Sequence, residues 1–162
     1  MRERLPAGRT HAKVRSMGLA HANITLENPK LPKLKPLKVK ALADSGSVFL
    51  CVPEHVAEQL QLEEIYEKEV ITADGRRAVY PYVGPIHVKF DNRGCMVGAV
   101  VMGDEVLLGA IPMEDMDLVV LPQARKVTVN PENPNIATAA AKGVRHPRKS
   151  VTSDDDGTSS EA

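Results

Sequence analysis

The stretch of sequence that decides the fold is residues 37–52, which read LKVKALADSGSVFLCV. Its two apolar halves are typical of buried or half-buried β-strands, and they are separated by Asp44-Ser45-Gly46. These three residue types also form ordinary turns. A carboxylate at the end of an apolar strand is therefore either part of a turn or one half of a paired-carboxylate site. The tripeptide occurs once in 162 residues, so the second interpretation requires another subunit.

The pattern on either side of this stretch predicts one small, mostly β domain over residues 17–135. Alternation of apolar and polar residues predicts a half-buried strand at 20–26. We expect hairpins at 68–82, with a type I′ turn at Asp74-Gly75, and at 86–102. Short helices are expected from Pro53 and from Pro112. Further short strands are expected at 48–52, 106–109, 119–121 and 126–129. Many short strands with two brief helices are typical of a small closed β-barrel.

The composition limits the kind of core and the compartment. Apolar residues make up 43% of the chain, aromatic residues only 3%, and there is no Trp, so the core must be aliphatic. Cys51 and Cys95 are expected to be reduced, buried thiols without a metal. We expect a cytoplasmic protein, because no stretch is typical of a transmembrane helix or a secretory signal.

Charge is distributed unevenly along the chain. Residues 1–16 carry a net charge of +4 and are expected to form a flexible arm, and residues 136–162 are expected to form a low-complexity, disordered tail. Residues 17–136 carry 12 basic and 16 acidic side chains. A net-acidic body disfavours nucleic acid as a partner.

A pair of Asp44 carboxylates would have a defined chemistry. Two carboxylates held close together share one proton, because they do not both ionise easily. One then acts as general base toward a water held between them, and the other acts as general acid. Gly46 lets the backbone turn tightly, and the Ser45 hydroxyl can fix the loop to its partner. This hydrolysis requires neither a metal nor another cofactor.

Longer stretches resemble a known family. The segment LADSGS at 42–47 is similar to a signature around a catalytic aspartate, and Leu107-Leu108-Gly109 is similar to the second signature of the same fold. The segments 52–60, 72–76 and 107–120 extend the likeness, which covers about residues 17–135. Together these segments resemble the small bacterial retropepsin-like (clan AA) aspartic proteases.

The resemblance implies a homodimeric aspartic endopeptidase with one retropepsin-like lobe per subunit, acting on a polypeptide and not on a membrane. It implies these roles: Asp44 as the catalytic residue, Ser45, Gly46 and Ser47 as the active-site loop, Asp74 and Gly75 as the flap, and Leu107, Leu108 and Gly109 as structural support. Two positions depart from the pattern of the family. Ser45 stands where Thr is commoner, and Ala43 stands where a larger β-branched residue is usual.

Other interpretations stay open. The chain could keep the fold without the reaction, as a retropepsin-like dimerisation or peptide-binding module with Asp-Ser-Gly as a structural turn. A swapped-hairpin transcription regulator is a more distant alternative, which the net-acidic body disfavours. Arg76 and Arg77 are expected to be a solubilising turn, with selection of acidic substrate side chains as the alternative. His21, His55 and His87 are too scattered to predict a metal site.

Overall fold

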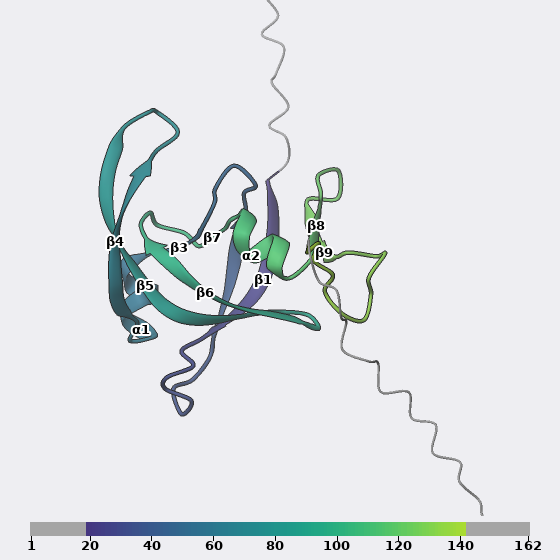
Figure 1. Cartoon of the computed structure of the whole chain (residues 1–162), viewed down its shortest axis with the longest axis horizontal. Coiled ribbons are helices and arrows are strands. Elements are labelled where there is room, and N and C mark those ends of the chain that lie inside the picture. The colour runs from purple at the N-terminus through teal and green to yellow at the C-terminus, as the bar shows by residue number, and fades with distance from the viewer. Residues whose placement is uncertain (1–18, 142–162) are drawn as a thin grey trace, which may run out of the picture.

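A computed structural model describes residues 19–141 of the chain (Figure 1). The described part contains these elements: β1 (Ala20–Glu27), β2 (Leu37–Ala43), β3 (Leu50–Val52), α1 (Glu54–Gln59), β4 (Glu63–Ile71), β5 (Arg77–Phe90), β6 (Arg93–Val101), β7 (Leu107–Leu108), α2 (Ala110–Asp115), β8 (Leu118–Leu121) and β9 (Lys126–Val129). The expected arm at 1–16 and the part of the expected tail after residue 141 lie outside the described residues. None of the described helices is long and apolar enough to cross a membrane.

The strands form one sheet that closes on itself. Their order is β4-β5-β6-β3-β7-β2-β1-β9-β8, and a further pairing of β5 with β1 closes six of them into a barrel. The β4–β5 hairpin extends beyond this barrel on one side, and β8 and β9 lie on the other (Figure 1). The sequence-based prediction of a mostly β protein with a small closed barrel and two short helices is therefore confirmed.

The barrel interior is aliphatic, as the composition requires. Alternate residues of β1, from Ala20 to Leu26, are all buried, which is the period-2 pattern of a strand with one core face. Helix α1 buries Val56, Ala57 and its C-terminal neighbour Leu60. The largest fully buried side chains include Ile24, Leu26, Leu50, Leu60, Ile86, Leu108 and Met116.

Several element boundaries differ from the expectation, since β4 begins at Glu63 instead of residue 68 and β7 spans only Leu107–Leu108, and two further boundaries differ for one shared reason. Strand β3 begins at Leu50 instead of Val48, and α2 begins at Ala110, two residues before Pro112. The amide of Ala110 donates to the carbonyl of Ser47 (2.7 Å), and the amide of Ile111 donates to that of Val48 (3.0 Å). The backbone before β3 thus binds the first turn of α2 instead of continuing the strand.

A small ionic cluster lies where β5 meets β1 and closes the barrel. Glu27 is opposite His87 in the register of these strands. The Glu27 carboxylate is 2.9 Å from the Lys89 ammonium and 3.3 Å from Nδ1 of His87. The hydrogen bond from Lys89 is the main reason that the pKa of Glu27 lies below its usual value, and His87 adds to the effect.

We expect Ile86→Ala to lower the free energy of unfolding by about 2–5 kcal/mol, because the side chain is fully buried and its removal leaves a cavity. Ile136→Ala is the matched control, since Ile136 is 76% exposed. Urea denaturation followed by circular dichroism measures both. Equal losses in the two variants would contradict the assignment of Ile86 to the core.

The Glu27 cluster predicts a pH dependence of stability. Because the pKa of Glu27 is lowered on folding, its contribution is present above the unfolded-state pKa, near 4.5, and is lost as the pH falls through the lower folded-state value. Thermal melts between pH 7 and pH 3 should therefore show a smaller acid-induced decrease for Glu27→Gln than for the wild type. Glu54→Gln, an exposed change on α1, should keep the wild-type slope.

Candidate active site

Asp44 is placed by a parallel pair of strands, β2 and β7. Leu42 lies opposite Leu107, and Ala43 lies opposite Leu108. The amide of Leu42 donates to the Val106 carbonyl (2.9 Å), and the amide of Asp44 donates to the Leu108 carbonyl (3.1 Å). The main chain therefore fixes Asp44 at the point where β2 ends.

The loop after β2 turns tightly and leaves its carboxylate in solvent. The amide of Ser47 donates to the carbonyl of Asp44 (3.1 Å), and the amide of Gly46 donates to its Oδ1 (2.9 Å). Asp44, Ser45 and Gly46 are exposed, whereas Ser47 is half-buried. Within residues 19–141, hydrogen bonds reach only Oδ1 of this carboxylate, and none reaches Oδ2.

Gly109 lets α2 approach this loop. A Cβ at position 109 would lie 2.2 Å from the carbonyl oxygen of Phe49 and 2.7 Å from that of Ser47. These distances are below any van der Waals contact, and the neighbours are backbone atoms that cannot move aside. Residues 107–109 thus lie directly behind residues 44–49, where the resemblance placed a supporting segment.

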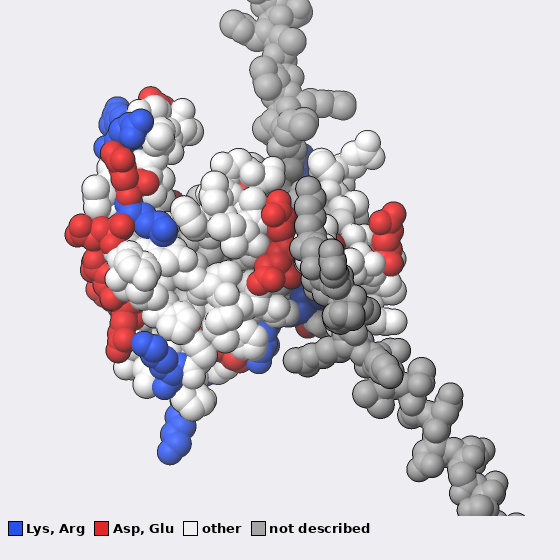
Figure 2. Space-filling model, in the orientation of Figure 1, with Lys and Arg blue, Asp and Glu red and all other residues white. Residues whose placement is uncertain are grey.

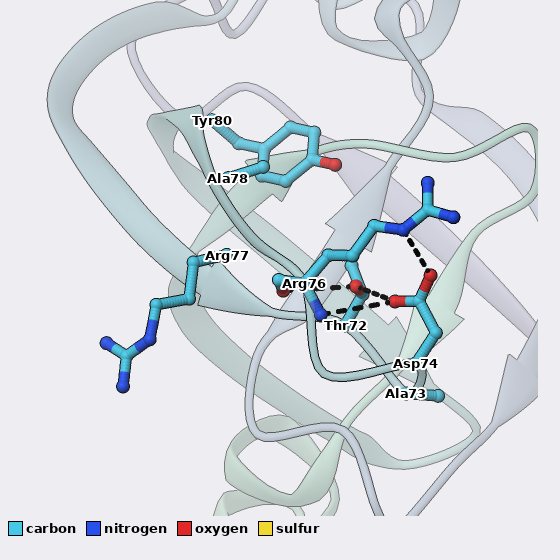
Figure 3. Close-up of a pocket in the computed structure, with 7 residues that line it drawn as sticks. All are labelled: Thr72, Ala73, Asp74, Arg76, Arg77, Ala78 and Tyr80. Atoms are coloured by element: carbon cyan, nitrogen blue, oxygen red, sulfur yellow. Dashed lines mark hydrogen bonds and ion pairs between the residues drawn. The ribbon is translucent and has the colours of Figure 1, made fainter.

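The β4–β5 hairpin carries Asp74 and Gly75 at its tip (Figure 3). The amide of Gly75 donates to the Thr72 carbonyl (2.8 Å), and the amide of Thr72 donates to the Arg76 carbonyl (2.9 Å). Gly75 has a φ of +81°, but Asp74 does not have a positive φ. A type I′ turn needs two such residues, so the predicted turn type is wrong. The Asp74 side chain shapes the loop by accepting hydrogen bonds from the Thr72 hydroxyl and the Arg76 amide.

The charges at the hairpin tip compensate one another. Arg76 Nε lies 2.9 Å from Asp74 Oδ2, and Arg77 Nη1 lies 3.4 Å from Glu69 Oε2. Figure 3 shows the Arg76 side chain directed toward Asp74 and that of Arg77 directed away from both. The Thr72 hydroxyl, followed by the Arg76 amide, lowers the pKa of Asp74. Each arginine therefore has an acidic partner within the hairpin itself.

Sequence reasoning missed an aromatic cluster that joins this hairpin to the Asp44 loop. The Phe49 ring packs edge-to-face on Tyr82, with centroids 5.9 Å apart, and Tyr66 stacks on Tyr82 at 6.4 Å. The Lys68 ammonium lies 4.9 Å from the Phe49 centroid and 4.7 Å from that of Tyr82. The sequence feature that could have indicated this cluster is the scarcity of aromatic residues. The whole chain has only five Phe and Tyr residues, and three of them meet here.

The two cysteines are buried free thiols, as expected. Burial raises the pKa of Cys51; the contact with the Ser47 hydroxyl offsets part of this rise, and the negative charge of Asp44 adds to it. Burial also raises the pKa of Cys95, to about 12. A thiol without access to its thiolate form is a poor nucleophile, so the geometry gives Cys51 a packing role behind the loop.

The histidines lie on separate elements, with His21 on β1, His55 on α1 and His87 on β5. In residues 19–141, no three His, Cys, Asp or Glu side chains are grouped as metal ligands would be. Comparison with protein-family models gave no match, and comparison with curated proteins gave no similar sequence.

Gly109→Ala should lower the free energy of unfolding by about 3 kcal/mol or more, because the added methyl would overlap two backbone carbonyls. Gly46→Ala is the comparison from the same loop. Its Cβ would meet only the Asp44 Oδ1 atom, at 3.2 Å, so its cost should be much smaller. Urea denaturation of both variants tests this difference, and a mild effect of Gly109→Ala would contradict the close packing of α2 on the loop.

Proposed function

We propose that this chain is a retropepsin-like aspartic endopeptidase that acts as a homodimer. The observation that carries the proposal is the exposed Asp44 carboxylate at the end of β2: the Asp44 amide donates to the Leu108 carbonyl, and the carboxylate accepts a hydrogen bond from the Gly46 amide. In each subunit one carboxylate would be presented on a rigid loop with one oxygen unpaired. A second copy of the same loop would complete the pair.

The surroundings of Asp44 support association with a second copy. Leu19 directly precedes Ala20, which is opposite Ala43 in the β1–β2 register, so Leu19 lies beside Asp44. Val48 follows in the loop, and Ile111 is hydrogen-bonded to it. Leu19, Val48 and Ile111 are 61%, 54% and 43% exposed. A two-fold contact at the Asp44 loops would bury these apolar side chains and bring the two carboxylates together.

The reaction follows from the pair of carboxylates. One shared proton leaves one Asp44 as general base and the other as general acid. The base takes a proton from a bound water, which attacks the peptide carbonyl, and the acid protonates the carbonyl oxygen. The tetrahedral intermediate then collapses: the Asp44 that took the water proton gives it to the nitrogen, which leaves as an amine, and the other Asp44 takes back the hydroxyl proton as the carbonyl reforms. No covalent bond to the protein forms at any stage.

The position of the β4–β5 hairpin suits an extended polypeptide as the substrate. Its tip and the 44–49 loop lie toward the same end of the molecule, at the top of Figure 1. Phe49 contacts Tyr82 and Lys68 of the hairpin, so the hairpin stands directly beside the loop. A polypeptide bound across the two Asp44 residues would pass along this hairpin, which would serve as its flap.

One observation favours the non-catalytic alternative. The Asp44 side chain stabilises its own turn by accepting the Gly46 amide, which is a structural role that requires no second subunit. In addition, Ala43 is small, so it contributes little packing beneath the loop. A module that binds peptides or dimerises without cleavage would keep these features.

Asp44→Asn distinguishes the two proposals, because an amide oxygen still accepts the Gly46 hydrogen bond but cannot act as a general base. We expect the cleavage rate of an unfolded-protein digest to decrease by about a thousandfold or more. Asp104→Asn, in the exposed turn before β7, should retain full activity. Sedimentation should show dimers for both variants.

Equal processing of the digest by wild type and Asp44→Asn would reject the peptidase. A wild-type protein that stays monomeric at high concentration would also contradict it.

A further inference from the structure

The β4–β5 hairpin has two chemically different faces. Side chains alternate along a strand, and residues opposite one another share a face. Tyr66 is opposite Tyr82 and Lys68 is opposite Tyr80, so one face is aromatic and cationic. The neighbouring pairs, which include Glu67 and Glu69, lie on the other face. The acidic side chains accordingly gather along the outer edge formed by β4 (Figure 2).

The cationic face is the one turned toward the Asp44 loop, since Lys68 lies over the ring of Phe49. Lys68 also differs from the other cations of the hairpin. Arg76 and Arg77 each have a carboxylate partner, at 2.9 Å and 3.4 Å. Within the described part of the chain, no carboxylate oxygen lies within 4.0 Å of the Lys68 ammonium. The positive charge of Lys68 beside the loop is therefore not compensated by any described carboxylate.

An apolar groove of about 380 Å³ adjoins this charge. The described residues that line it are all uncharged, and they include Phe49, Ile65, Tyr82, Met96, Ile111 and Pro112. Ile65 and Met96 are 45% and 54% exposed and take no part in the proposed subunit contact, so this part of the groove is open to an incoming ligand. It belongs to the largely uncharged surface between the acidic edge of β4 and helix α2 (Figure 2).

The backbone at Gly98 leaves room for the Tyr82 ring, which forms one wall of this groove. Tyr82 lies against Gly98 of β6, where a Cβ would be 2.4 Å from a ring carbon. Any other residue at position 98 would therefore displace the tyrosine ring. The ring is held on its other sides by Phe49 and Tyr66. Groove, ring and ammonium thus form one preorganised surface, continuous with the Asp44 loop through Phe49.

We propose that this surface is a specificity site for an extended polypeptide in which an apolar side chain and an acidic side chain lie close together. The apolar side chain occupies the groove, and the acidic one pairs with Lys68. The site rests on the proposed peptidase function and gives it a substrate class. The acidic outer face of β4 repels the same carboxylate, which favours binding on the inner face alone.

Cleavage-site profiling tests the proposal, with a peptide digest of unfolded proteins as the probe and the full-length chain as the enzyme. Wild type should favour Glu or Asp at one fixed distance from the cleaved bond by about fivefold, as expected for a partly exposed ion pair. Lys68→Gln should remove this preference, and Lys68→Glu should replace it with a preference for Lys or Arg. Ile65→Asp should remove an apolar preference at a second fixed position.

Lys35→Glu is the matched control, because it makes the same charge change on an exposed lysine between β1 and β2 and should leave the profile unaltered. On peptides without the acidic residue, Lys35→Glu should cleave at the wild-type rate, and the Lys68 variants should lose less activity than on acidic peptides, while circular dichroism reports on the folding of each variant. An unchanged acidic preference in Lys68→Glu would overturn the specificity site while leaving the peptidase intact. If no form of the protein cleaves the digest, the proposed function fails and the specificity site fails with it.

Discussion

The close approach of the Asp44 loop to β7 and α2 is the constraint on which the rest of the site depends. Three main-chain hydrogen bonds, from Asp44 to Leu108, from Ala110 to Ser47 and from Ile111 to Val48, tie the segments together. The approach is possible only because residue 109 has no side chain. It defines where β2 ends, where α2 begins and which way the Asp44 carboxylate points. A site that must align with a second copy of itself benefits from this rigidity.

The hairpin and the loop are coupled through aromatic packing. Phe49, five residues after Asp44, contacts Tyr82 of β5, which in turn rests on Gly98 of β6. Lys68 completes the contact from β4. The only region rich in aromatic residues is therefore placed between the proposed catalytic loop and its flap, while the barrel core is aliphatic. Such placement suits recognition, because aromatic rings provide a large contact area with little flexibility.

Much of the fold was predictable because its signals are local. The alternation in β1, the amphipathic helix α1 and the chain reversals at 72–76 and 91–92 are each encoded in a few neighbouring residues. Errors arose where groups other than the expected main-chain partner bind the backbone. Residues 48 and 49 were predicted as strand, but β3 begins at Leu50 and the Val48 carbonyl binds α2 instead. The Asp74-Gly75 turn is shaped by the Asp74 side chain instead of by two positive φ angles. The sequence analysis considered the charges of Arg76 and Arg77, but both have acidic partners, whereas Lys68 has none among residues 19–141.

The sequence by itself determined the class of fold, the aliphatic core and the single Asp-Ser-Gly, because periodicity, composition and motif count need no knowledge of contacts. It also contained the Glu-Lys-Glu alternation of β4, which separates acidic from basic side chains on two faces. Only the tertiary structure decided which face meets Phe49 and where the apolar groove opens. The physical reason is that these features join residues from five elements or loops far apart in the chain, and packing among them sets distances that no local pattern encodes.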